Sequence, residues 1–505
     1  MNSAEKKGFD LSLRFVSLFA AAHVVLVLLQ TNFVPLSGGW NVVWLGLELL
    51  LGGGAFCLSL GCFLYAKSKR TPSLEGFDSL FRQIRSPGLL FLLMWTVWAY
   101  VACFIAIREG RTSFYHNVRY LFYQTADLLV LFPLGVYYGK KGDSRLLSAL
   151  YDVCLALFAA QLFYAFYRFL SGEAQFTAFF GRAFDFSILR AIFGVNSNHT
   201  GAYAAFFLIA GLWRFRSMTS RAGKVLLIAA LAVTFIAFVM VESRGAIFGV
   251  VAAVGFFAGA LCWRKKEYAS VGRAFASIGC CVVAAAAFLA LFYGARAAAL
   301  SVQDRVLASN TTTASEPNAE ETKPADETES SGTAKPADKT SERSSTSNIA
   351  PAAGAEGDKE MRSLIGKRAS SLGGRKNIWL TVIRGMKKDR HILLHGTSMA
   401  NTSDWVATVL GTPFRTHNQF LELLTAEGLP ALILFILWLI WLAGKSLGLC
   451  FSPDSRANWL LPLSLLLLLV HNMVEMMIVA RPHVVCGFFY LVAGYVAGFA
   501  PKKQK

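Results

Sequence analysis

Charged residues are scarce in this sequence of 505 residues. Asp, Glu, Lys and Arg make up 16% of the chain and hydrophobic residues 55%, whereas soluble domains have roughly 25% charged and roughly 45–50% apolar residues. A single soluble core cannot hide this much apolar surface, so the composition excludes an ordinary cytoplasmic enzyme. Proline is sparse too, with 14 residues against 41 Phe, and large apolar side chains suit a bilayer.

The sequence also lacks the usual cysteine and histidine motifs. Its nine Cys include no CxxC pair and all fall in apolar spans or at their inner ends, so they imply no disulfide framework. Its eight His include no HExxH pair, the spacing found in many helical zinc hydrolases. We therefore expect no metal and no cofactor.

Long apolar runs, in contrast, are abundant. A helix of about 17–25 apolar residues crosses a bilayer, and the sequence contains twelve such candidates. The first lacks a small-residue cleavage site, so no cleavable signal peptide is expected. The predicted spans are residues 11–30, 40–65, 88–107, 121–139, 147–170, 199–213, 225–241, 246–263, 274–293, 425–443, 459–478 and 484–500.

The net charge of +18 has a topological explanation, because cytoplasmic loops collect Lys and Arg. The distribution of these residues predicts an all-α integral membrane protein with about twelve transmembrane helices and both termini in the cytoplasm. Arg suits bidentate binding of phosphate or carboxylate, although an interfacial Arg can also simply snorkel. Every basic residue of the short outer loops is Arg: Arg108, Arg111, Arg119, Arg182, Arg190, Arg244 and Arg481.

One long extracytoplasmic loop, residues 294–418, separates spans one to nine (1–293) from spans ten to twelve (419–505). Residues 307–360 contain 11 acidic and 5 basic residues and almost no large apolar ones, which predicts a disordered insert. Residues 361–418 contain 10 basic and 2 acidic residues. We expect this second half to be folded, basic and partly helical.

An amphipathic helix is predicted within the basic half. Two glycines precede its apolar residues and two lysines follow them, which matches helix start and stop signals. Arg375 would lie at the helix N-terminus, where free N–H groups and the dipole favour an anion. This suggests an anionic, lipid-borne ligand, or simply attraction to anionic headgroups. The apolar residues at helical spacing are Ile378, Trp379, Val382, Ile383 and Met386.

Three polar clusters lie on the predicted outer face: residues 196–199, 242–245 and 416–430. The second contains Arg244, which either points into the bundle or pairs with a neighbour such as Glu242. The third begins with His417, where the basic half meets span ten. A neutral His is the usual general base near pH 7, although a lone loop His is often structural.

Ionisable residues inside predicted spans are costly and are functional suspects. His471 and Glu475 are four residues apart in span eleven, so we expect them to share a helix face, as a packing lock or part of a site. Asp127 and Asp152 would suit the proton path of a transporter. Glu48 is a further ionisable residue inside a predicted span, the second one.

The segment HNQFLELLTAEGLP, residues 417–430, resembles the signature of the O-antigen ligase and polymerase superfamily. Ser-Arg-Gly at 243–245 and Gly-Arg…Trp at 374–379 resemble two further elements of that family, in the same order. The family plan of about twelve spans, with one large outer loop after the ninth, also fits. This sequence has Asn-Ser-Asn at 196–198 where the family often has Asn-Pro-Asn.

The resemblance implies a GT-C-like membrane glycosyltransferase of the bacterial cytoplasmic membrane, with its active site on the extracytoplasmic face. It implies an undecaprenyl-diphosphate-linked glycan donor, a glycan, lipid or protein hydroxyl as acceptor, and an inverting reaction without metal or nucleic acid. Arg244 and Arg375 would hold the diphosphate and stabilise the leaving group. His417 would act as the catalytic base. The further substrate-binding candidates are Asn198, Asn418 and Trp379.

Two other functions remain open at this point. A secondary transporter or flippase of envelope precursors would explain twelve spans, but such proteins usually show an internal repeat, and none is visible between the two halves. A non-catalytic scaffold of an envelope complex would explain the acidic insert. Within the leading class, the sequence does not separate a ligase from a polymerase, because both use the same donor.

Overall fold

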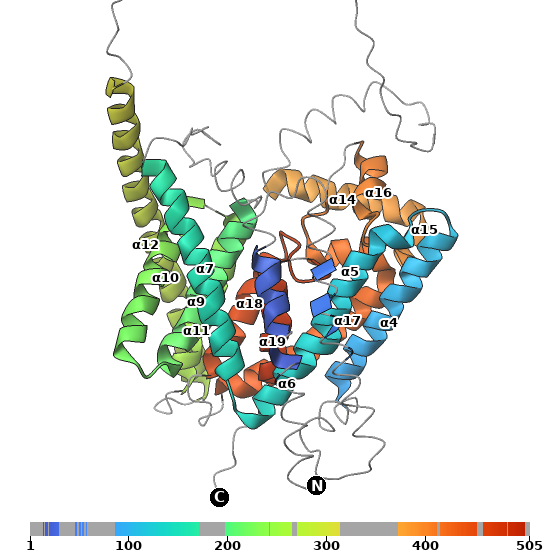
Figure 1. The fold of residues 1–505 in the computed structure, drawn as a ribbon, viewed down its shortest axis with the longest axis horizontal. Helices are drawn as coiled ribbons and strands as arrows, with labels where there is room; N and C mark the ends of the chain where they lie inside the picture. Colours follow the sequence, from blue (N-terminus) through green and yellow to red (C-terminus); the bar gives the residue numbers. More distant parts are fainter. Residues whose placement is uncertain are drawn as a thin grey trace, which may run out of the picture.

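The structure is a computed structural model, and the regular elements among the residues it describes are all helices (Figure 1). This confirms the predicted all-α class for that part of the chain. The predicted features outside the described residues are most of the second span, Glu48, Arg182, Arg190, Asn196, Glu242, nearly all of the 307–360 insert and residues 361–371 of the basic half. The described residues are 86–170, 197–241, 243–264, 270–313, 372–411, 415–451, 458–481 and 483–499, with some between 14 and 57.

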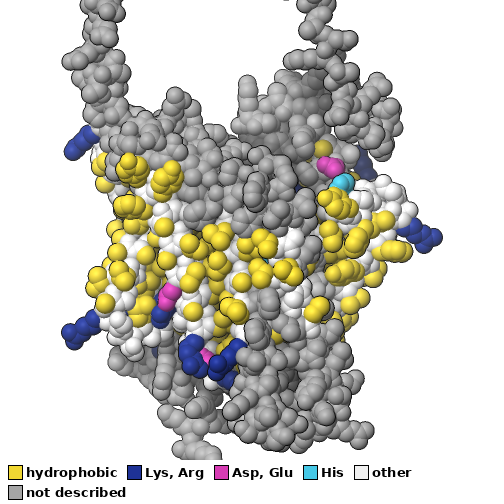
Figure 2. Space-filling model, in the orientation of Figure 1, with side chains coloured by type: hydrophobic (Ala, Val, Ile, Leu, Met, Phe, Trp, Pro, Cys, Tyr) yellow, Lys and Arg dark blue, Asp and Glu magenta, His cyan; other side chains and the backbone are white. Residues whose placement is uncertain are grey.

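Within the part of the chain that the structure describes, six helices are long and apolar enough to cross a membrane. Their outward faces carry large apolar side chains that are 64–72% exposed, among them Phe104, Leu226, Phe275 and Ile440. Figure 2 shows hydrophobic side chains in a broad belt across the molecule, with Lys and Arg near its margins. Lipid is the solvent that suits such a surface. The six helices are α4 (Pro87–Arg108), α7 (Arg145–Leu170), α10 (Arg221–Val241), α11 (Arg244–Arg264), α12 (Ser270–Thr313) and α17 (Gln419–Phe451).

Helices that are shorter or less apolar occupy the other predicted spans that the structure describes. An apolar helix covers Val16–Leu29. Three consecutive helices, α5, η2 and α6, cover the predicted span at 121–139. The count of twelve spans and the orientation of the termini remain predictions. These helices are α5 (Phe114–Ala126), the π-helix η2 (Asp127–Leu131), α6 (Phe132–Lys141), α9 (Ser197–Ser217), α18 (Leu461–His471, after a 3₁₀ turn at Asn458–Leu460) and α19 (Val484–Gly498).

Facing glycines bring α6 and α19 into close contact. A Cβ atom on Gly139 would lie 2.2 Å from the Tyr495 carbonyl oxygen, and one on Gly494 would lie 2.0 Å from that of Phe132. Small residues allow membrane helices to pack backbone against backbone in this way. The contact fixes α19, and with it the segment that precedes it.

The helix α17 is broken at Gly428, whose φ of 80° is left-handed. In a membrane protein the backbone groups that such a break frees must be satisfied by other protein groups. Here N–H groups from two other segments supply the partners, so the first two turns of α17 form a separate short helix. The Thr425 carbonyl accepts from Thr397 N (2.8 Å), that of Ala426 from Ser398 N (2.8 Å) and that of Glu427 from the Trp98 indole (2.7 Å).

A small helical layer covers one end of the bundle, above α5 and α17 in Figure 1. It consists of α14 (Leu372–Lys388), α15 (Arg390–His395) and α16 (Thr402–Leu410). The predicted amphipathic helix is confirmed, because Ile378, Val382 and Met386 are buried in the core of this layer, although Ile383 is 40% exposed. The helix includes the two glycines in its first turn instead of starting after them.

Two predicted boundaries are wrong. Helix α18 ends at His471, so residues 472–478 do not continue the eleventh span, and His471 and Glu475 do not share a helix face. The Asn472 side chain accepts a hydrogen bond from Met477 N (2.6 Å) and donates to Leu468 O (2.7 Å), and such local bonds compete with helix continuation. Helix α12 continues to Thr313, into the first residues of the predicted insert.

Candidate functional site

Glu475 lies where four segments of the chain meet, in the non-helical stretch after α18. Its Oε1 accepts hydrogen bonds from Arg375 Nη2 (2.8 Å) and from Asn198 Nδ2 (2.6 Å). Its Oε2 lies 3.2 Å from Nδ1 of His417. The carboxylate is almost fully buried, with 4% of the side chain exposed. Three of the residues predicted from sequence are therefore joined by one buried carboxylate.

The pKa of Glu475 reflects two opposing influences. Burial raises it, but the hydrogen bond and positive charge of His417 and the charge of Arg375 lower it more, to about 2. Charge-assisted hydrogen bonds to the ionised form have this effect. Glu475 is thus a carboxylate at neutral pH and can only accept hydrogen bonds.

His417 sits in a turn that is held on both sides. Its φ of 48° is left-handed, a conformation that a non-glycine residue adopts at a cost of order 1–3 kcal/mol. The Asn418 side chain caps α17 by accepting from Leu421 N (2.9 Å) and donates to Met473 O (2.8 Å). The Thr416 hydroxyl donates to Glu422 Oε2 (2.9 Å). These bonds aim the His417 side chain, a quarter of which is exposed, at Glu475.

Arg375 is in the first turn of α14, as predicted. Besides Glu475, it donates from Nη1 to the Val474 carbonyl. Its Nε has no hydrogen-bond partner among the described residues, and 12% of the side chain is exposed. The guanidinium therefore retains N–H groups for a ligand at a helix N-terminus, where an anion is favoured.

The Ser-Arg-Gly tripeptide borders the site without joining its hydrogen bonds through Arg244. Ser243 is buried and donates to Asn198 Oδ1 (3.4 Å), and a Cβ on Gly245 would lie 2.9 Å from Nδ1 of His471. Arg244 itself is exposed at the start of α11 and has no hydrogen bond or ion pair with another described residue. Among the described residues its guanidinium has no partner, while its two neighbours in the chain contact Asn198 and His471.

Trp379 and Asn418 hold the site together. The Trp379 indole Nε1 donates to the Thr416 carbonyl (2.8 Å), and both polar groups of the Asn418 side chain bond to the backbone. These contacts give both residues a structural part. Substrate binding by Trp379, Asn418 and Asn198 remains a prediction.

The sequence profile of the family described as O-antigen ligase matches residues 227–436. Residues 227–436 therefore form a domain of the O-antigen ligase family. The predicted resemblance is confirmed, and the matched residues include Arg244, Arg375 and His417. A search of curated proteins finds no match to the chain.

The residues that match the O-antigen ligase family end before Glu475. The sequence did not predict the partners of Glu475 either. Glu475 stood out as an ionisable residue in an apolar run, but its spacing pointed to His471. The two residues make no hydrogen bond with each other, and His471 packs against Gly245 instead. Only the break of the helix at His471 turns Glu475 toward His417, 58 positions earlier in the chain.

A second buried cluster, which the sequence did not predict, lies five residues beyond His417 at Glu422. Glu422 is completely buried, and its Oε1 pairs with Arg415 Nη1 (2.9 Å) and Arg481 Nη2 (2.7 Å). The Arg481 guanidinium lies 5.6 Å from the centre of the Tyr120 ring. Arg481 is one of the predicted outer-loop arginines, and in the structure its guanidinium pairs with Glu422.

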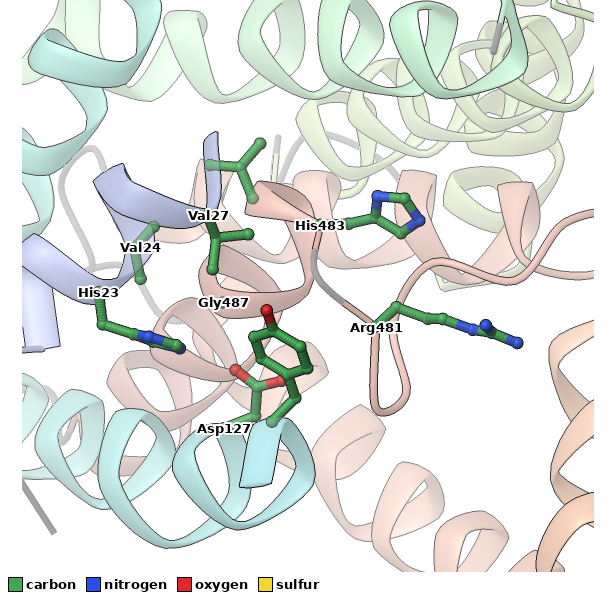
Figure 3. A pocket seen from close by; sticks show the side chains of 9 residues that line it. His23, Val24, Val27, Asp127, Arg481, His483 and Gly487 are labelled. Carbon is green, nitrogen blue, oxygen red and sulfur yellow. The ribbon is translucent and has the colours of Figure 1, made fainter. Parts of the chain in front are cut away.

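A pocket adjoins this second cluster through Arg481. Figure 3 shows Asp127 and His23 on one side of it and Arg481 and His483 on the other. Asp127 accepts from the Cys486 thiol (Sγ to Oδ2, 3.0 Å). Asp152, its supposed partner in a proton path, forms a bidentate ion pair with Arg214 (2.8 and 2.6 Å). The two aspartates therefore have separate partners.

Metal ligands do not gather at the site. Among the residues that the structure describes, no group of three His, Cys, Asp or Glu side chains is arranged to hold a metal ion. Among the described residues, Arg375 brings positive charge to Glu475 (Nη2 to Oε1, 2.8 Å), together with the dipole of α14.

Proposed function

We propose that this protein is an inverting membrane glycosyltransferase that moves a glycan from an undecaprenyl-diphosphate carrier to an acceptor hydroxyl. The O-antigen ligase family already places it among membrane proteins that ligate or polymerise glycans. The donor, the stereochemistry and the metal-independent mechanism are the further steps of the proposal. We propose that the transfer takes place on the outer face of the bacterial cytoplasmic membrane.

The observation that carries the proposal is the juxtaposition of Arg375 and His417 on one buried carboxylate, with Arg244 exposed beside them. A diphosphate needs at least two cationic donors at fixed positions. A hydroxyl nucleophile needs a base within hydrogen-bond reach. The site offers both within one small region, at the N-terminus of α14.

In the proposed reaction Arg244 and Arg375 bind the diphosphate. The acceptor oxygen attacks the anomeric carbon from the face opposite the diphosphate, while the His417 imidazole takes the hydroxyl proton. The new carbon–oxygen bond forms as the bond from the anomeric carbon to the diphosphate oxygen breaks. The carrier diphosphate leaves with the electron pair, and the arginines neutralise its growing charge.

The contacts of the two buried aspartates support transfer over ion-coupled transport. Asp152 is ion-paired to Arg214, and Asp127 accepts from Cys486, so they form no continuous path. The layer of α14, α15 and α16 also has a clear use in a transferase, because it carries Arg375 and holds the His417 turn.

The test is the surface glycan profile of a strain that carries R244A, R375A or H417A in place of the wild-type chain. We expect transfer to fall by about two orders of magnitude or more, as for loss of a positioned base or a transition-state donor, and the lipid-linked donor to accumulate. The matched controls are R108A and H116A, which alter exposed residues of the same predicted face, and both should retain transfer. Full transfer by R375A and H417A would refute the mechanism.

The deletion strain separates the two activities of the superfamily. Long glycan chains that remain on the carrier lipid indicate a ligase. Single repeats attached to the final acceptor, without long chains, indicate a polymerase.

A further inference from the structure

We propose that Glu475 is a positioning residue that acts through both His417 and Arg375. Through His417 it raises the rate of transfer, and through its charge beside Arg375 it weakens donor binding. This inference rests on the proposed function, because it concerns the base and the diphosphate-binding cation of that reaction. Glu475 touches neither the donor nor the acceptor. It lies outside the residues that match the O-antigen ligase family.

Glu475 bonds to side chains from three other segments of the site. It receives Arg375 from α14, Asn198 from α9 and His417 from the turn before α17. Its own segment is anchored, because Gln419 N donates to Asn472 O (2.9 Å) and Ile478 N donates to the Gln419 amide oxygen (3.2 Å). A carboxylate held this firmly sets the positions of the groups that bond to it.

The bond to His417 decides which ring nitrogen is the base. An ionised carboxylate only accepts, so Nδ1 must carry a proton when it lies 3.2 Å from Glu475 Oε2. The neutral ring then has its lone pair at Nε2. When Nε2 takes the acceptor proton, the imidazolium that results sits beside a negative charge, which stabilises it.

The bond to Arg375 has a different effect. One Nη2–H is directed to Glu475 and one Nη1–H to Val474 O, which fixes the plane of the guanidinium. Arg375 Nε is buried and has no partner among the described residues, so the guanidinium keeps N–H groups that the protein does not use. The carboxylate also places a negative charge beside the place where the diphosphate binds. Removing that charge relieves a like-charge repulsion.

These two effects predict opposite changes in E475Q. The amide keeps the size of the side chain and loses the charge, so the His417 tautomer is no longer imposed. We expect transfer in cells to fall at least tenfold. Purified full-length E475Q in nanodiscs should bind undecaprenyl diphosphate, as the probe, as tightly as the wild-type protein or more tightly. R375A should bind this probe more weakly.

The matched control is E109Q. Glu109 also bridges an arginine and a histidine, Arg111 (3.0 Å) and His391 (2.8 Å), but at a partly exposed position away from the site. E109Q should keep both transfer and binding. If E475Q does not accumulate as a folded protein, E475D keeps the charge but withdraws the carboxylate by one methylene, and it should lose transfer with binding retained.

The outcomes separate this inference from the proposed function. Transfer by E475Q within threefold of wild type, while H417A and R375A lose theirs, would overturn the role of Glu475 alone. A parallel loss of binding, transfer and thermal stability in E475Q and E475D would overturn it too, since it would mark a purely structural residue. Retained transfer in H417A and R375A would overturn the proposed function itself.

Discussion

The indole Nε1 of Trp379 donates a 2.8 Å hydrogen bond to the backbone carbonyl of Thr416, the residue before His417. This bond links α14, which carries Arg375, to the turn that carries the base. The bond therefore helps to set the distance between Arg375 and His417, the proposed diphosphate ligand and base. Thr416 is buried, and a buried carbonyl without a hydrogen-bond donor destabilises the fold by about 1–3 kcal/mol. The Trp379 indole supplies that donor.

W379F should therefore impair transfer more than binding. Phe fills most of the space but cannot donate, so the His417 turn loosens while Arg375 stays in place. We expect transfer to fall about tenfold, with undecaprenyl-diphosphate binding unchanged. Glycan profiles and nanodisc binding check the two parts. W405F is the matched control, because Trp405 packs against the same apolar cluster; an equal loss in W405F would mean that the indole bond is not the cause.

Glu422 offers a prediction about stability. It is fully buried between Arg415 and Arg481, and removing one partner of a buried ion pair leaves uncompensated charge, at a cost of about 3–5 kcal/mol. E422Q should lower the thermal unfolding midpoint of the purified protein by several degrees. E109Q, whose carboxylate is 29% exposed, should lower it little. Equal midpoints for E422Q and wild type would show that the cluster does not stabilise the fold.

The sequence predicts most helices well, because apolar runs of membrane length leave few alternatives. It also predicts the amphipathic α14, since periodicity alone places Ile378, Val382 and Met386 on one face. It fails where a local polar group ends an apolar run. The run at 459–478 remains hydrophobic past its true end, and only the bonds of Asn472 stop α18 at His471.

For the site, too, the sequence predicts some residues and misses how they are connected. Arg375 and His417 were predicted from a motif, and the structure places them on a common partner. That partner was assigned to His471 by spacing, because a four-residue separation indicates contact only within an intact helix. The partner of Glu475 depends instead on where the chain turns after α18, which no local pattern encodes.

Gly428 should not tolerate a side chain. Its φ is 80°, and a Cβ atom there would lie 2.2 Å from the Leu394 carbonyl oxygen. The clash involves backbone, so relief requires the junction of α15 and α17 to move. The combination of φ 80° and ψ −176° is essentially reserved for glycine and adds about 1–3 kcal/mol for another residue. G428A should reduce the yield of folded protein and the unfolding midpoint. G444A, in the same helix with nothing within 4 Å, should leave both unchanged, and similar behaviour of the two variants would contradict the close contact.

The acid stability of the protein should contain a contribution from Glu475. Its pKa is lowered from 4.5 to about 2 in the folded state, because bonds and charges from His417 and Arg375 outweigh burial. A lowered folded pKa stabilises the protein at pH values above the unfolded value, and this contribution is lost as the pH falls toward the folded value. The difference in unfolding midpoint between wild type and E475Q should therefore shrink as the pH falls from about 4.5 to about 2. Thermal unfolding of both proteins across this range measures it, with E109Q as the reference for other carboxylates. A difference that does not shrink over this range would mean that Glu475 is not held as a carboxylate by His417 and Arg375.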